Sequence, residues 1–128
     1  MATPAMSIKE MVTSGERVLT LTQELSGSQR ISLEESIADA VTNGQINVAL
    51  DVSKIIAICI NSTKDVTFET NSGGSPDDTI SLKANVPYIW HNQSYHTLLL
   101  GTDVTAVFIT NASGAAATVT IEALVDAT

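Results

Sequence analysis

The sequence predicts an all-β fold: one antiparallel β-sandwich domain, jelly-roll-like, preceded by an extended N-terminal arm. Six short runs rich in β-branched residues carry this prediction, at 55–60, 66–70, 79–82, 88–90, 104–110 and 119–125. Clusters of Asn, Gly, Pro and Asp separate them, as at 71–78 and 111–114. Aromatic residues make up only 4% of the chain, so the core must consist mainly of Val, Ile, Leu and Ala. Short strands with turn signals between them are typical of sandwiches and barrels.

The N-terminal segment, residues 1–15, has no firm periodicity and contains Pro4. We expect an extended arm here, with a frayed terminus as the alternative. The sandwich domain is then expected over residues 16–128. Its first strand is predicted at 17–25, where Leu19, Leu21 and Leu25 alternate with polar residues. Such alternation indicates a half-buried strand.

The segment 31–41 fits two structures. Ile31 and Leu33 alternate as in a strand, whereas Leu33, Ile37 and Val41 have helical spacing behind a capping-box pattern. We expect a strand that ends in a loop near Asp39. An Asn-Gly turn at 43–44 follows, then renewed alternation over 46–50 and one short helical turn capped at residue 51.

Charge and composition limit the function. The 128 residues suffice for one domain, and the net charge is −8, with seven acids and one lysine in residues 65–128. An acidic chain without a basic patch is not expected to bind nucleic acid or an anionic membrane surface. The longest apolar run has six residues and no signal peptide is expected. The single cysteine, Cys59, lies among isoleucines as a small buried hydrophobe, and the absence of disulfides suits synthesis in a reducing cytoplasm.

The stretch 88–96 is the densest polar and aromatic segment, and it contains the only Trp, both Tyr and both His residues. Tyr and Trp are favoured at protein interfaces because they combine a large contact area with a polar tip. For Trp90, the alternative is a plug at the end of the sandwich core with its indole N–H satisfied. The predicted interface residues are Met6, Ile8, Met11, Tyr88, Trp90, Tyr95 and His96.

No catalytic, cofactor or metal site is expected, so the chain is not predicted to be an enzyme. His91 and His96 have the spacing of neither a helical nor a strand pair of metal ligands. Asp77 and Asp78 lack the alternating pattern of a calcium loop and fit turn positions better. Ser72 lies in a glycine-rich loop without an adjacent histidine.

Several runs over residues 45–128 resemble a group of small structural proteins of tailed bacteriophages. These runs are ALDVSKI at 49–55, DVT at 65–67, SPDDTI at 75–80, PYIWH at 87–91, GTDVT at 101–105 and TNASGAA at 110–116. The resemblance implies a virion protein made in the host cytoplasm, most like a capsid decoration (cement) protein. Such proteins are compact β-domains that associate, often as trimers, and brace neighbouring major capsid protein subunits.

The acidity agrees with a place on the outer capsid surface, because the inner surface faces packaged DNA. Two alternatives stay open. One is a tail or baseplate structural protein. The other is a carbohydrate-binding β-sandwich module, in which Tyr88, Trp90 and Tyr95 stack on sugars while Asn92 and Gln93 form hydrogen bonds.

Overall fold

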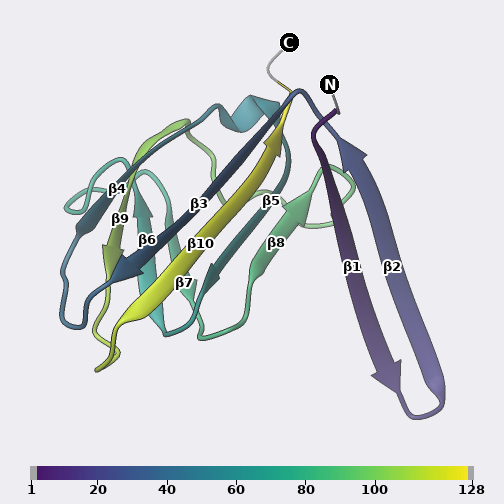
Figure 1. Cartoon of the computed structure of the whole chain (residues 1–128), viewed down its shortest axis with the longest axis horizontal. Coiled ribbons are helices and arrows are strands. Elements are labelled where there is room, and N and C mark those ends of the chain that lie inside the picture. Colours follow the sequence, from purple (N-terminus) through teal and green to yellow (C-terminus); the bar gives the residue numbers. More distant parts are fainter. Residues whose placement is uncertain (1–2, 127–128) are drawn as a thin grey trace.

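The computed structural model describes residues 3–126 and is all-β, with antiparallel strands and one short 3-10 turn (Figure 1). The strands are β1 (Ala5–Ser14), β2 (Arg17–Ser26), β3 (Gln29–Ile37), β4 (Gly44–Leu50), β5 (Ile55–Ser62), β6 (Val66–Thr70), β7 (Thr79–Leu82), β8 (Tyr88–His91), β9 (Val104–Thr110) and β10 (Ala117–Val125). The 3-10 turn η1 (Val52–Lys54) lies between β4 and β5. Among the residues described, no helix has the length and apolar character to cross a membrane.

Strands β3 to β10 form two four-stranded sheets, in the orders β3-β10-β5-β8 and β4-β9-β6-β7. Their pairing is nested along the chain, because β3 pairs with β10, β4 with β9, β5 with β8 and β6 with β7. Further pairs, β5 with β10 and β6 with β9, join these strand pairs into the two sheets. The remaining strands, β1 and β2, form a separate two-stranded sheet.

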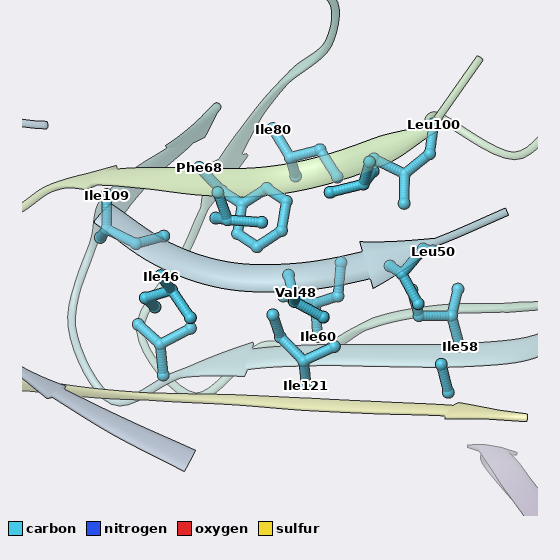
Figure 2. Close-up of a cluster of buried hydrophobic side chains, with 14 of the residues drawn as sticks. Ile46, Val48, Leu50, Ile58, Ile60, Phe68, Ile80, Leu100, Ile109 and Ile121 are labelled. Atoms are coloured by element: carbon cyan, nitrogen blue, oxygen red, sulfur yellow. The ribbon is translucent and has the colours of Figure 1, made fainter. Parts of the chain in front are cut away.

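The two four-stranded sheets pack face to face through aliphatic side chains (Figure 2). In β10, Val119, Ile121 and Ala123 are fully buried at every second position, as period-two alternation requires. Phe68 on β6 is the one aromatic side chain at the centre, and only 1% of it is exposed. The predicted sandwich and its aliphatic core are confirmed.

The strand predictions within the sandwich are confirmed as well. All six runs form strands. The ambiguous segment 31–41 is strand as far as Ile37, within β3, which pairs with β10 along its whole length, and a loop with Asp39 follows. Pairing with β10 decides in favour of the strand, because Ile31 and Leu33 face the core only in extended backbone. The turn η1 is capped as predicted, since the Asp51 carboxylate accepts the backbone N–H of Ser53.

The N-terminal segment differs from the expected arm. Residues 1–2 lie outside the described part, but Ala5–Ser14 is a regular strand that pairs with β2 over ten residues. The two strands are joined by a two-residue loop, Gly15 and Glu16, in which Gly15 has a positive φ of 58°. A glycine at this position suits a type II′ hairpin turn, so the arm folds back on itself. The segment 5–26 is called the N-terminal hairpin below.

The burial expected for residues 17–25 is also wrong. The segment is a strand, but Leu19 and Leu21 are exposed and only Leu25 is partly buried. The reason is tertiary: the N-terminal hairpin leaves the sandwich and projects away from it, so most of its length has nothing to pack against (Figure 1).

The hairpin joins the sandwich through a narrow connection at Gly27. The Gly27 N–H donates to the Pro4 carbonyl at 3.0 Å, and the next N–H, of Ser28, donates to the Val125 carbonyl at 2.9 Å. A Cβ atom on Gly27 would lie 2.6 Å from the Val125 carbonyl oxygen. Only glycine therefore fits where the chain crosses the end of β10.

Candidate functional site

The aromatic segment 88–96 begins on β8, the edge strand beside β5. Tyr88 and Trp90 are partly buried and pack against the core cluster. The Trp90 indole N–H donates to the His96 carbonyl at 3.0 Å, and the Tyr88 hydroxyl accepts the Leu99 N–H at 3.0 Å. Both polar tips therefore fix the loop between β8 and β9 against its own sandwich. This arrangement agrees with the reading of Trp90 as a core plug.

The tip of the same loop is exposed. Tyr95 is fully exposed and Leu99 is about half exposed, at 51%. The His96 ring lies edge-on to the Tyr88 ring, with 6.2 Å between the ring centres, so His96 also supports the loop. We call Tyr95 and Leu99 the loop patch.

The two histidines lie in different surroundings. His91 is buried, and its Nδ1 accepts the Gln93 N–H at 3.2 Å, whereas His96 is exposed. Within residues 3–126, no group of three or more His, Cys, Asp or Glu side chains is placed to hold a metal ion.

The aspartates of the glycine-rich loop bond to their own chain. Asp78 Oδ2 accepts the N–H groups of Gly101 and Thr102, at 3.0 and 3.3 Å. Asp77 accepts the Asn71 side-chain amide at 2.7 Å. The Asp78 contacts join the loop after β6 to the loop before β9, and the Asp77 contact lies within the loop after β6, so both aspartates have structural roles. Ser72 has the same kind of role, since its hydroxyl accepts two backbone N–H groups within its own turn.

Cys59 does not lie in the core between the sheets. It is partly buried on the opposite face of β5 from Ile58 and Ile60, beside its cross-strand neighbour Glu122. It lines a cavity of about 270 Å³ between the sheet and the hairpin, together with Ile8 and Ile89. Burial raises the pKa of the Cys59 thiol, and the Glu122 carboxylate raises it further. The thiol therefore stays protonated and unreactive at neutral pH.

The hairpin provides a second surface, and the structure divides its predicted interface residues into two groups. Ile8 is only 6% exposed and packs with Met6 and Leu25 against Ala57 and Leu124 on the outer face of the sheet. Met6 and Ile8 thus contact the protein's own sandwich. Met11, farther along β1, is 65% exposed.

The outer half of the hairpin exposes four more large apolar side chains, none of them among the predicted interface residues. They are Val12, Val18, Leu19 and Leu21, which with Met11 are called the hairpin patch. A local signal was present in Gly15, because glycine at the first central position favours a type II′ hairpin turn. Reading residues 1–15 as an unpaired arm concealed it.

Comparison with models of protein families, with curated proteins and with solved structures finds no match to the chain. The candidate surfaces are therefore interpreted from their own geometry.

Proposed function

We propose that this protein is a capsid decoration (cement) protein of a tailed phage, which binds the outside of the assembled shell and braces major capsid protein subunits. The observation that carries the proposal is the division of the chain into a well-packed sandwich and projecting apolar surfaces. The core supplies a rigid body, while the loop patch and the hairpin patch offer contacts without using any reactive group.

The strand order supports a finer description of the body as a jelly roll. Eight strands, β3 to β10, pair in nested fashion from the two ends of the chain segment inward. A long hairpin wound up in this way produces the two Greek keys of a jelly roll. Fold alone does not determine function, so the proposal depends on the surfaces.

We assign the loop patch to the shell contact. Tyr95 provides a large, amphipathic contact area, and Trp90 and Tyr88 hold its loop in one conformation. A preorganised loop loses little conformational entropy on binding. Many copies bound to one shell then add their weak contacts into a large stabilisation.

The acidic charge supports a place on the outer shell surface, away from DNA, and self-association as a trimer completes the proposal.

The carbohydrate-binding alternative is weakened by the geometry. Tyr88 and Trp90 are partly buried with their polar tips bonded internally, which leaves Tyr95 as the fully exposed ring of the three.

Co-sedimentation tests the proposal. Purified protein is mixed with expanded capsids that lack it, over a salt series. Saturable binding at a fixed ratio to the major capsid protein is the expected result. The salt dependence of the affinity measures how much electrostatic attraction contributes to shell binding. Absence of binding to intact shells would overturn the proposal in favour of a tail component or, with a positive glycan screen, a sugar-binding module.

A paired substitution tests the assigned surface. Tyr95→Ser with Leu99→Ser should weaken shell binding at least about tenfold, since two exposed apolar contacts are lost. The matched control is Val86→Ser, which removes an exposed apolar side chain from the turn between β7 and β8. If both variants lost the same amount of shell binding, the loop patch would not be the contact with the shell.

A further inference from the structure

The hairpin has two faces, which the register of β1 and β2 defines. Residues directly opposite each other share a face, and successive pairs alternate between faces. Ile8 opposite Gln23 and Met6 opposite Leu25 are on one face, which packs on the sandwich. The same face continues outward through the pairs Glu10–Leu21 and Val12–Leu19. We call it the inner face.

The inner face changes from buried to exposed along its length. Ile8 is 6% exposed, whereas Val12 and Leu19 are 58% and 60% exposed. Beyond the exposed Glu10, which lies opposite Leu21, the outer part is aliphatic like the base but has no sandwich beneath it (Figure 1). Met11 and Val18, on the opposite face, are exposed as well. The base already shows what this face fits, namely another apolar β-surface.

The hairpin also has two free edges. In the described residues, β1 and β2 form a two-stranded sheet whose only strand partners are each other. A two-stranded ribbon is marginally stable in water on its own, and its unpaired edges are templates for added strands. Each strand has ten residues, although only the base of the hairpin contacts the sandwich.

The charge distribution along the chain indicates which partner fits the outer half of the hairpin. Residues 11–22 contain one acid, Glu16, and one base, Arg17, so their net charge is −1 + 1 = 0. The whole chain has a net charge of −8, so the other residues carry all of it. Salt screens distant charges, so repulsion between two acidic copies is smallest where they meet through a neutral region. The outer hairpin is neutral and apolar, and an aliphatic surface of this kind is complementary to itself.

We infer that the outer half of the N-terminal hairpin is the contact between copies of this chain, in which the inner face and edge of one hairpin pack against the hairpin of a second copy. Val12, Leu19 and Leu21 of each copy then form a shared apolar core outside the sandwich. This inference rests on the self-association in the proposed function but does not need the capsid, so it is tested without shells.

The first test is the mass of the full chain in solution by sedimentation equilibrium, over a wide concentration range. We expect an oligomer, and the triple variant Val12→Thr, Leu19→Thr, Leu21→Thr should raise its dissociation constant at least about tenfold. Threonine retains strand propensity, so the hairpin itself is preserved. The matched control, Val86→Thr, removes an exposed apolar group outside both patches and should leave the mass unchanged.

Cross-linking provides a second readout that does not depend on loss of association. In a Cys59→Ser background, Leu19→Cys should form a disulfide between copies on mild oxidation, and Val86→Cys should not.

A monomer at every concentration, or an oligomer that the triple variant leaves intact, would overturn the inference. The inference would also be overturned if the chain were monomeric and bound shells, and the triple variant abolished that binding. The hairpin would then be assigned to the capsid contact. A dimer that the triple variant dissociates would support the hairpin contact while refuting the proposed trimer.

Discussion

The sandwich and the N-terminal hairpin are built from similar alternating strands but differ in what covers their apolar side chains. In the sandwich, Ile121 on β10 and Val107 on β9 are fully buried between two sheets. In the hairpin, Leu19 has comparable chemistry and strand position yet is 60% exposed. The difference shows that an alternating pattern specifies a face without specifying that the same chain covers it. An apolar face left uncovered in a folded chain is a candidate interaction surface.

The largest difference between the regions should appear on truncation of large apolar side chains. Phe68→Ala removes a ring that is 1% exposed, and should lower the free energy of unfolding by about 3–5 kcal/mol. Leu19→Ala should change it by less than about 0.5 kcal/mol. Urea unfolding at low protein concentration measures both, since dilution removes any contribution from association. A loss of several kcal/mol from Leu19→Ala would contradict the division into covered and uncovered faces.

The second prediction concerns a buried amide in the sandwich. Asn111 is fully buried, and its side-chain N–H groups donate to the carbonyls of Ile37, Ala38 and Ala115 at 3.1, 3.2 and 2.9 Å. Asn111→Ala leaves these carbonyls without that donor and should cost about 1–3 kcal/mol. Asn92→Ala, at an exposed position, is the control and should stay within about 0.5 kcal/mol in the same thermal or urea assay. Equal stabilities of the two variants would contradict the role of Asn111 in joining the loops after β3 and β9.

The third prediction concerns the connection between the two regions. Gly27→Ala places a Cβ atom 2.6 Å from the Val125 carbonyl, so the backbone must shift and stability should fall by about 1 kcal/mol or more. Hydrogen exchange should show the loss at the hairpin base, with faster exchange of the Gln23 and Leu25 amides than in the unaltered chain. Gly74→Ala is the control, because its Cβ meets no atom within 4 Å. Unchanged exchange at the base would refute a tight connection.

The smallest effect concerns Cys59 beneath the hairpin. Its raised pKa means that the folded chain holds the thiol proton at pH values where the unfolded chain has lost it. The resulting contribution to stability is complete below the pKa of the unfolded chain, about 8.5, and is lost as pH rises through the higher folded value. The alkylation rate of the thiol should therefore reach half its maximum at a higher pH in the folded protein than in urea. Identical pH profiles in the two states would contradict the burial of Cys59 by the hairpin base.

Much of the sandwich was predictable because its signals are local. Turn residues separate β5 to β10, and each strand carries enough β-branched side chains to identify it. The segment 31–41 was undecided between two periodicities until its partner was known, since only β10 gives Leu33 a core to face. Of the predicted interface residues, Tyr95 is fully exposed, whereas Met6 and Ile8 contact their own sheet. The interface role of Tyr95 stays a prediction.

The sequence by itself determined the all-β class, the strands of the sandwich, the aliphatic core and the acidic character. Each of these depends on residue type and short-range spacing. Only the tertiary structure decided that residues 5–26 form a projecting hairpin, that Ile8 is buried while Leu19 is exposed, and that Cys59 lies beneath the hairpin instead of between the sheets. Burial depends on which surfaces meet across distant parts of the chain, and alternation along one strand contains no information about its neighbour.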